Sequence, residues 1–336
     1  MDAYRHRLIT AKGAPPTSWA RVREPTREPL RVGAVQHRFT PDADLHRERV
    51  ADGIRLAVRE GATVVCLPEL TLSPYFAITP GGPEAAGAAP EPLETGPTLA
   101  FAAAMAKETG AFVHASLYER ADAGDGLGFN TAICVDPSGA LVARTRKLHI
   151  PVTAGYHEDR YFRPGPAGDD AVPVVELATG PHPRFGFPTC WDQWFPELAR
   201  AYSLRGAEVI VYPTAIGSEP DHPDFDTEPL WEQVIVANGI ANGTFMVAVN
   251  RTGEEPPGGG GGGAGHAAAG GGPPARIRFY GSSFISDPYG RKLVQAPRDE
   301  PAVLVADLDL DQRRDWLELF PFLRTRRPDA YGALTE

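Results

Sequence analysis

The sequence predicts an α/β fold in which apolar strands alternate with helices. Two such series follow each other along the 336 residues, and 42% of the residues are hydrophobic, which is enough for a substantial buried core. The strands are apolar along their whole length, a pattern typical of sheets that helices cover. We therefore expect one large α/β domain over residues 30–332, whose two halves are rough structural repeats.

The first series is predicted to run strand, helix, strand, loop and helix, and to end in three strands. Apolar residues at helical spacing (Val50, Ile54 and Ala57) define the first helix, and continuous apolar runs define the strands. The expected boundaries are strand 30–36, a helix ending at Gly61, strand 63–69, loop 77–92, helix 97–109, strands 112–119 and 131–136, and a return strand after the turn PSGA.

The second series repeats the alternation with the same kinds of signal. Its expected elements are strand 184–190, helix 195–205, strand 208–214, a helix over about 229–241, and strands 245–251, 282–287 and 302–310. Because active sites of such sheets lie at the carboxyl ends of strands, polar residues at these ends are the candidates for function.

Two segments outside these series lack the pattern of a packed element. Residues 1–29 contain many Arg, Pro and Thr without a sustained apolar period, so we expect an N-terminal tail that is flexible or draped on the surface. Residues 253–274 are so rich in Gly and Ala that they predict a disordered insertion between two strands. We assign no chemistry to the Gly-rich insertion.

Composition excludes several classes of function. A net charge of −10 and a pI near 5.4 argue against nucleic acid as a partner, since no basic patch is visible. No run of 18 apolar residues predicts a membrane span, and the N-terminus lacks the apolar core of a signal peptide. The chain has three cysteines, and such a small, odd number does not indicate a disulfide framework. We expect a soluble, cytoplasmic protein.

Glu69, Lys147 and Cys190 lie at or near the ends of predicted strands. A thiol nucleophile needs a base for its proton and a positive charge or donor for the developing oxyanion, and these three side chains supply that set. Taken singly, Glu69 and Lys147 could be solvated surface charges. A buried structural role is the default for any cysteine and is retained for Cys66 and Cys134. Cys190 differs because a strand passes into a helix there.

The segments around these residues resemble the three catalytic blocks of the nitrilase superfamily, in the same order. The matching segments are CLPELTLSPYF (66–76), RKLHIP with GYHEDRYFRPG (146–165), CWDQWFPELAR (190–200), YPTAIG (212–217), ANGIANGTFMVAVNRTG (237–253) and FYGSSFISDPYG (279–290). They cover the chain from about residue 30 to 332. Within the superfamily the resemblance is greatest to the N-carbamoylputrescine amidases.

This resemblance implies a fold and a set of roles. The fold would be a four-layer αββα sandwich, which in a homo-oligomer stacks as αββααββα. Cys190 would be the nucleophile, Glu69 the general base and Lys147 the stabiliser of the tetrahedral intermediate, with Glu158 helping to position substrate or transfer protons. Neither a metal nor an organic cofactor is expected. The implied reaction converts N-carbamoylputrescine to putrescine, ammonia and carbon dioxide through a thioester.

The choice of substrate depends on the residues around the nucleophile. Trp191 and Asp192 would give an aromatic and acidic pocket that suits a cationic amine, and we assign Tyr75 and Ala215, from two matching segments, to the same pocket. Alternatively, Trp191 packs against the following helix and Asp192 caps it. A ureidopropionate-like acid, an aliphatic amide or a nitrile is the alternative substrate. A non-catalytic binding scaffold is the alternative from another class.

Overall fold

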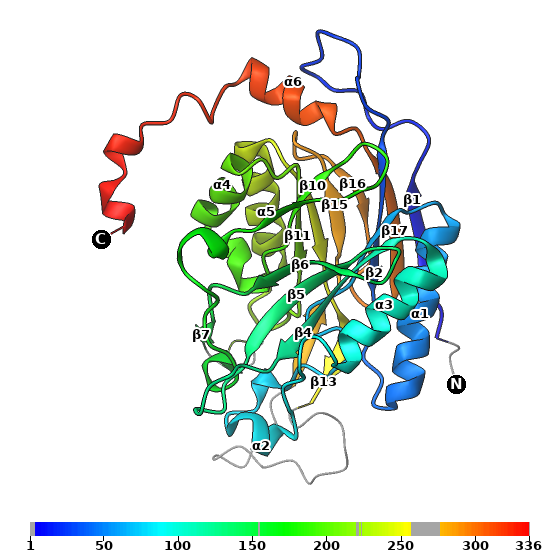
Figure 1. The fold of residues 1–336 in the computed structure, drawn as a ribbon, viewed down its shortest axis with the longest axis vertical. Helices are drawn as coiled ribbons and strands as arrows, with labels where there is room; N and C mark the ends of the chain where they lie inside the picture. The colour runs from blue at the N-terminus through cyan, green and yellow to red at the C-terminus, as the bar shows by residue number, and fades with distance from the viewer. Residues whose placement is uncertain (1–3, 154, 220–221, 223, 257–275, 336) are drawn as a thin grey trace.

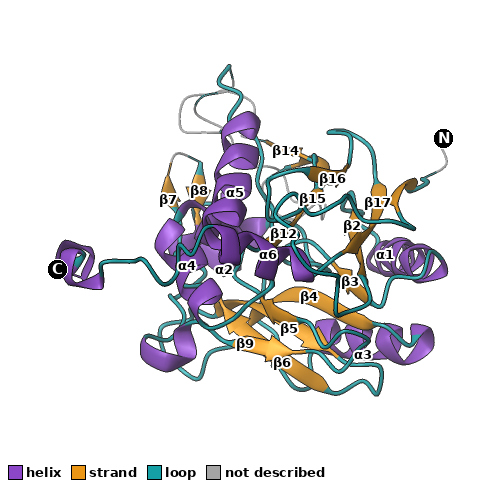
Figure 2. Cartoon of the chain, turned by 90° about the horizontal axis from the view of Figure 1, so that it is seen from above, coloured by secondary structure: helices purple, strands orange, loops and turns teal. Residues whose placement is uncertain are grey.

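The computed structural model describes residues 4–153, 155–219, 222, 224–256 and 276–335. Two mixed β-sheets lie face to face, and helices cover the outer face of each (Figure 1). Figure 2 shows helices α1 (Ala43–Arg59) and α3 (Pro97–Thr109) on one side of the molecule and α4 (Pro196–Leu204) and α5 (Glu228–Asn242) on the other. This arrangement confirms the predicted αββα sandwich.

Each sheet contains parallel and antiparallel strand pairs. The first sheet has the order β1 (Arg7–Ala11), β17 (Ala302–Leu308), β2 (Leu30–Gln36), β3 (Val64–Cys66), β4 (Phe112–Glu119), β5 (Phe129–Val135) and β6 (Leu141–Arg146). The second has the order β16 (Lys292–Gln295), β15 (Phe284–Ser286), β12 (Phe245–Val249), β11 (Val209–Pro213), β10 (Arg184–Gly186) and β9 (Val174–Glu176). The central strands of each sheet are parallel.

Alternation along the strands divides the apolar residues among three layers of core. On β2, Val32 and Ala34 point between the sheets, whereas Val35 packs under α1 and α3. Gly33 allows α1 to approach closely, because a Cβ added there would lie 2.8 Å from the Cβ of Ala57. The continuous apolar runs of the sequence are therefore explained by strands that are covered on both faces.

The N-terminal segment differs from the expected tail. Residues 7–11 form β1, which pairs in parallel with β17 at the edge of the first sheet. Five residues are too few for a visible period in the sequence, so the strand was missed. Residues 12–29 contain no helix or strand and lie on the surface beside α6 (Asp311–Leu319), where Arg21 pairs with Asp309 and Asp315.

Smaller elements lie outside the two sheets and the helices that cover them. They include the hairpin β13 (Thr252–Glu255) and β14 (Ile277–Tyr280), the short pair β7 (Val152–Thr153) and β8 (Tyr156–His157), and helix α2 (Gly82–Ala86). Residues 253–255 of the predicted Gly-rich insertion thus belong to a strand, because Glu255 pairs with Ile277 across the hairpin. Its residues 257–274 lie outside the described residues. Within the described ranges, no helix is long and apolar enough to cross a membrane.

His46 on α1 gives a prediction about stability at low pH. Its side chain is 1% exposed and its Nε2 lies 3.0 Å from the carbonyl oxygen of Thr71. Burial lowers the pKa of His46 to about 4, so the folded protein binds its proton less readily than the unfolded chain, whose histidine pKa is 6.5. Stability should therefore fall as the pH decreases from 6.5 to about 4, by about 3 kcal/mol for this residue alone.

Urea unfolding at several pH values tests this prediction. The matched variant is His46→Gln, whose amide keeps a donor for the Thr71 carbonyl but has no proton to gain. Its free energy of unfolding should depend less steeply on pH than that of the wild type between pH 6.5 and 4. Equal slopes for the two proteins would contradict the assignment.

Candidate active site

Three loops at strand ends bring the predicted catalytic residues together. Glu69 lies three residues beyond the end of β3, and Lys147 directly follows β6. Cys190 begins the 3-10 helix η4 (Cys190–Trp194), four residues after β10 ends. Strands β3 and β10 end earlier than expected, at Cys66 and Gly186, so the residues before Glu69 and Cys190 form connecting segments rather than ladder positions.

Lys147 lies between two carboxylates and is 0% exposed. Its Nζ donates to Glu69 Oε1 at 2.9 Å and to Glu158 Oε2 at 2.7 Å. Burial alone would lower the pKa of Lys147, but attraction to Glu158 and Glu69 outweighs it and raises the pKa. The side chain is therefore a fixed ammonium group at neutral pH.

Glu69 presents its two oxygens to different surroundings. Oε1 accepts hydrogen bonds from Lys147 and from Asn130 Nδ2, the latter at 2.6 Å. Oε2 is buried and has no hydrogen-bond partner among the described residues. Because one oxygen is held by two donors, the other keeps its lone pairs for a proton from a neighbouring group. This is the arrangement that a general base requires.

Glu158 is oriented by a tyrosine as well as by the lysine. The hydroxyl of Tyr75 donates to Glu158 Oε1 at 2.7 Å. Burial raises the pKa of Glu158 to about 7, although the Lys147 ammonium opposes this. A carboxyl group with a pKa near neutrality suits proton transfer, and the sequence resemblance placed Glu158 in this set.

Cys190 has an unusual backbone conformation. Its φ of 42° lies in the left-handed region that non-glycine residues rarely adopt, and such conformations cluster at functional sites. Burial raises the pKa of the Cys190 thiol, Glu69 raises it further, and Lys147 opposes them. The resting residue is therefore a thiol that needs a base. Cys66 and Cys134, by contrast, are fully buried in the core between the sheets.

The thiol lies at a pocket that contains most of the predicted substrate-binding residues. Tyr75, Trp191 and Ala215 all line it, together with Glu158. Its remaining walls are formed by Pro151, Tyr156, Ile216 and Glu219. Glu219 was not identified from the sequence, because a glutamate in the loop segment GSEP carries no pattern that separates it from a solvated charge.

Asp192 does not line this pocket, and its predicted role in binding substrate is replaced by a structural one. Its Oδ2 accepts from the Thr189 amide at 3.0 Å, and its Oδ1 accepts from the His149 amide at 3.0 Å. His149 Nδ1 lies 2.7 Å from the same oxygen. Asp192 thus belongs to the capping box of η4 and ties this helix to the segment that follows Lys147, whereas the alternative interpretation of the sequence had it cap the next helix.

Comparison with known proteins identifies the family of this fold and site. The model of the carbon-nitrogen hydrolase family matches residues 31–318. The chain belongs to the carbon-nitrogen hydrolase family. Members of this superfamily are cysteine amidohydrolases, and the protein is accordingly a hydrolase of carbon-nitrogen bonds other than peptide bonds, acting on a small molecule.

Relatives in this hydrolase family cover nearly the whole chain. An N-carbamoylputrescine amidase of Arabidopsis thaliana is 33% identical over 311 residues, covering 93% of this chain and 97% of that protein. A citrullinase of Francisella tularensis is 32% identical over 309 residues, covering 91% of this chain and 98% of that protein. The crystal structure of a carbon-nitrogen hydrolase from Helicobacter pylori G27 matches with a TM-score of 0.77 and 30% identity, covering 92% of this chain and 99% of that one.

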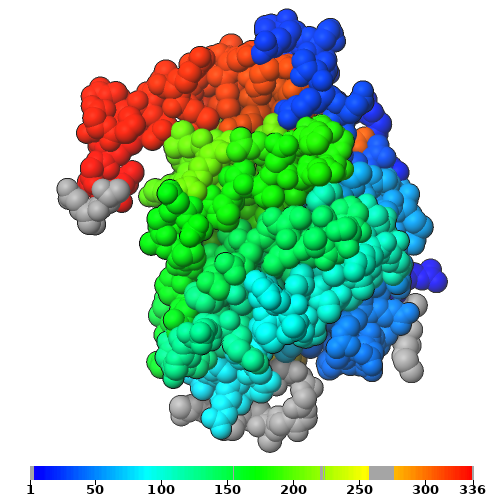
Figure 3. Space-filling model, viewed as in Figure 1, coloured from blue at the N-terminus to red at the C-terminus, as the bar shows by residue number. Residues whose placement is uncertain are grey.

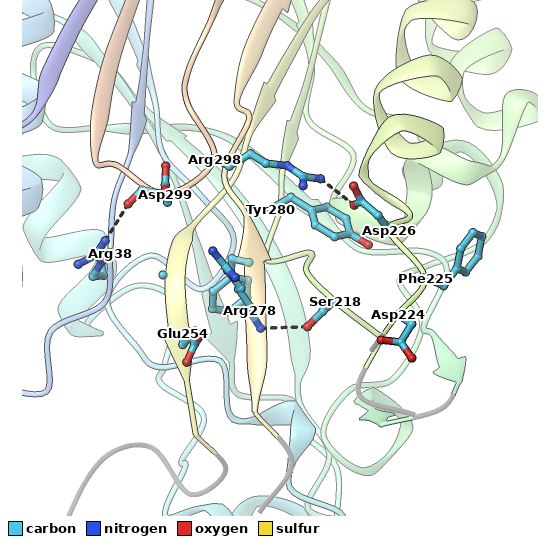
Figure 4. A pocket seen from close by; sticks show the side chains of 12 residues that line it. Arg38, Ser218, Asp224, Phe225, Asp226, Glu254, Arg278, Tyr280, Arg298 and Asp299 are labelled. Carbon is cyan, nitrogen blue, oxygen red and sulfur yellow. Dashed lines mark hydrogen bonds and ion pairs between the residues drawn. The ribbon is translucent and has the colours of Figure 1, made fainter. Parts of the chain in front are cut away.

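A second pocket of this hydrolase lies beside the β13–β14 hairpin (Figure 4). It is wider, and two of its arginines are held by neighbouring groups: Arg298 Nη2 lies 2.7 Å from Asp226 Oδ1, and Arg38 Nη2 donates to the backbone carbonyl of Asp299 at 2.8 Å. Its lining contains neither cysteine nor lysine. The smaller pocket at Cys190 is therefore the candidate active site.

The sequence interpretation also missed Arg251, which holds the loop that carries Glu69. This arginine is 0% exposed and its Nη2 donates to the carbonyls of Glu69 at 2.9 Å and Ser73 at 2.7 Å. Its Nη1 donates to Glu255 Oε1 at 2.8 Å, and Glu255 Oε2 in turn accepts from the Tyr75 amide at 2.7 Å. One guanidinium thus fixes the segments of two active-site residues.

Replacing Arg251 by methionine should therefore lower kcat as well as stability. We expect kcat to fall about 10- to 100-fold, because displacement of a reacting group by an ångström has effects of this size. The free energy of unfolding should decrease by about 3–5 kcal/mol, because Glu255 would lose its cation and remain as a buried charge. The matched control is Arg21→Met, which removes two ion pairs, with the buried Asp309 and Asp315, outside the pocket at Cys190. An unchanged kcat in folded Arg251→Met would contradict the positioning role.

Proposed function

We propose that the protein hydrolyses a linear N-carbamoyl amine, N-carbamoylputrescine, to putrescine, ammonia and carbon dioxide. The observation that carries this proposal is the pocket at Cys190, whose walls are acidic and aromatic. Among its described lining residues, Glu158 and Glu219 are acidic, Tyr75, Tyr156 and Trp191 are aromatic, and none is Arg or Lys. Such walls favour a cationic ligand over an anionic one.

In the proposed mechanism Cys190 attacks the carbamoyl carbon while Glu69 accepts the thiol proton through Oε2. The bond from sulfur to carbon forms, and the carbonyl π electrons move to oxygen. The Lys147 ammonium and the backbone N–H of Trp191 stabilise this oxyanion, and each such donor typically contributes about 2.7–4 kcal/mol. Because Lys147 is already held by two carboxylates, it needs no reorganisation during the reaction.

Collapse of the tetrahedral intermediate breaks a carbon-nitrogen bond. Glu69 returns its proton to the departing nitrogen, which leaves a thioester on Cys190. Water then attacks the thioester carbon while Glu69 accepts a proton from it. The bond from this carbon to sulfur breaks, and Glu69 returns the proton to the Cys190 sulfur, which restores the thiol. The second nitrogen leaves with the carbamate product, which decomposes, so one water is consumed for each carbon dioxide released. Glu158 positions the substrate beside Lys147.

Citrulline is the second candidate substrate, because a citrullinase is among the relatives of similar identity. Citrulline carries a carboxylate next to its ammonium group, and the described pocket walls offer no cationic side chain for it. A panel of N-carbamoylputrescine, citrulline, 3-ureidopropionate, an aliphatic amide and a nitrile tests the choice by kcat/KM for ammonia release. We expect N-carbamoylputrescine to give the highest value. A preference for an anionic ureido acid would contradict the proposal.

We also propose that the protein is a cytoplasmic homo-oligomer. Residues 320–335 extend away from the body of the molecule beyond α6 (Figure 3). Phe320, Tyr331 and Leu334 on this segment are all more than 40% exposed, which favours burial against a second copy. Light scattering should give at least twice the chain mass of 36.1 kDa. A mass equal to that of one chain at micromolar concentration would contradict this.

A further inference from the structure

We propose that Asn130 is a positioning residue that holds the base Glu69 and the ammonium group of Lys147 at a fixed spacing for catalysis. This inference rests on the proposed mechanism, in which Glu69 accepts the proton of Cys190. Asn130 lies on β5 and is 0% exposed. It is not among the described residues that line the pocket at Cys190, so it acts on the reaction through its neighbours.

Asn130 binds one catalytic residue with its side chain and another with its backbone. Its Nδ2 donates to Glu69 Oε1 at 2.6 Å, and its carbonyl accepts from the Lys147 amide at 2.8 Å. Lys147 Nζ donates to the same Glu69 oxygen at 2.9 Å. Glu69 lies on a loop, whereas Asn130 belongs to a strand, and strands hold functional groups more precisely than loops do. Asn130 is therefore the anchor of both groups.

One orientation of the Asn130 amide group fits its surroundings. Its Oδ1 accepts from the hydroxyl of Ser116 at 3.4 Å, on the neighbouring strand β4. Exchange of the amide nitrogen and oxygen would place two acceptors, Oδ1 and Glu69 Oε1, against each other. The donor therefore faces the carboxylate. Glu69 Oε1 is held in this way, and Oε2, which has no hydrogen-bond partner among the described residues, is the oxygen that accepts the thiol proton.

Ser116 connects this contact to the backbone that follows the base. Its Oγ accepts from the Leu70 amide at 3.1 Å, and Leu70 has a φ of 50°, in the left-handed region. The Ser116 amide donates to the Thr71 hydroxyl at 3.0 Å. A non-glycine residue keeps such a conformation only where the surrounding contacts determine it, and these positions cluster at functional sites. Strands β4 and β5 thus fix both the side chain of Glu69 and the loop that carries it.

Two variants of Asn130 separate positioning of the base from filling of space. Asn130→Leu has a similar volume but no donor. Asn130→Asp keeps the shape, and its carboxyl group donates to Glu69 only when it is protonated. We expect Asn130→Asp to lower kcat about 10- to 100-fold at pH 8 and to change KM less than about threefold, because the base is displaced and the pocket is not. Asn130→Leu should lose a similar factor in kcat.

The two variants should respond differently to pH. The introduced carboxyl group would face Glu69, which belongs to the cluster of Lys147, Glu158 and Cys190, and a second carboxylate beside Glu69 is protonated readily because like charges repel. From pH 8 to pH 6, kcat of Asn130→Asp relative to wild type should rise at least about fivefold, whereas Asn130→Leu should show no recovery. Glu158, with a pKa of about 7, titrates in all three proteins, so this comparison removes its effect.

The matched control is Asn242→Asp, the same change at a buried asparagine at the end of α5, outside the pocket. It should keep the wild-type kcat at both pH values. Equal losses in the two Asn130 variants at every pH, no loss in either, or a loss through KM alone would overturn the inference. Ser116→Ala removes only the hydroxyl that orients the amide, and should lower kcat about 3- to 10-fold. A wild-type kcat in folded Ser116→Ala would also contradict the inference.

The rate at which iodoacetamide labels Cys190 gives the same comparison without a substrate. Labelling of Asn130→Asp should be slower than that of the wild type at pH 8 and should approach it at pH 6. Equal labelling rates in the wild type and both Asn130 variants would overturn the inference. Failure of the proposed function is a distinct result, since the wild type would then release no ammonia from N-carbamoylputrescine while the labelling rates still test Asn130.

Discussion

Replacement of Cys190 by alanine is expected to reduce ammonia release by about 10,000-fold or more. The sulfur of Cys190 would form the thioester intermediate. Loss of a covalent nucleophile typically has effects of this size on kcat. The fold should persist, because Cys190 packs at a pocket and its removal deletes one sulfur atom. Ammonia release measured under saturating substrate, with near-UV circular dichroism as a check of folding, tests this expectation.

A second thiol provides the control for this variant. Cys134 lies between the sheets at 0% exposure, so Cys134→Ala removes a thiol without touching the pocket. It should lose some stability, roughly 1 kcal/mol for a small buried group, and keep its kcat. Ammonia release that persists in Cys190→Ala at the wild-type rate would exclude Cys190 as the nucleophile.

Replacement of Lys147 by methionine should damage both catalysis and stability. Glu69 and Glu158 would remain as buried carboxylates without their cation, a loss that typically costs about 3–5 kcal/mol. The oxyanion would also lose a donor, which lowers kcat by about 100- to 1,000-fold. Urea unfolding and single-turnover kinetics measure the two effects separately.

A double variant distinguishes charge compensation from catalysis. In Lys147→Met combined with Glu158→Gln, one of the two unpaired carboxylates is removed. Part of the lost stability should return, whereas kcat should stay low because the ammonium group is still missing. Recovery of kcat together with stability would mean that Lys147 acts only as a structural cation.

The alternation of apolar runs and helical periods was sufficient to predict the layers of the fold. The predicted strands 30–36 and 112–119 and the helix 97–109 coincide with β2, β4 and α3. Strand β1 was missed, because a five-residue edge strand is recognisable only by its pairing with β17. Short apolar runs predicted the ends of strands less accurately. Of the predicted strand 184–190, only the first three residues form a strand, β10.

The site could be predicted where chemistry and local sequence coincide, and not where it depends on distant contacts. Ordered segments identified Glu69, Lys147, Glu158 and Cys190 as a group, and the structure brings the first three into direct contact. The partners that orient them come from elsewhere in the chain. Arg251 is 182 residues from the Glu69 carbonyl that it binds, and no spacing rule connects such residues.

The acidic character of the substrate pocket comes from a residue other than the one predicted. Sequence reasoning derived an acidic pocket from Asp192, which the structure shows to be a helix cap. The pocket is nevertheless acidic, because Glu219 lines it. The direction of a side chain, into the pocket or back onto the backbone, follows from tertiary contacts such as the bridge at Gly217. The inference of a cationic substrate therefore now depends on a different carboxylate.

Alkylation by iodoacetamide, followed by peptide mass mapping, tests the central role of Cys190 most directly. The reagent is a small amide, so the pocket should admit it, and the thiol should displace iodide while Glu69 accepts the proton. We expect modification of Cys190 in the folded protein, protection by N-carbamoylputrescine, and loss of activity in proportion to labelling, while Cys66 and Cys134 stay unmodified in the core. Full activity after complete labelling of Cys190 would contradict the account.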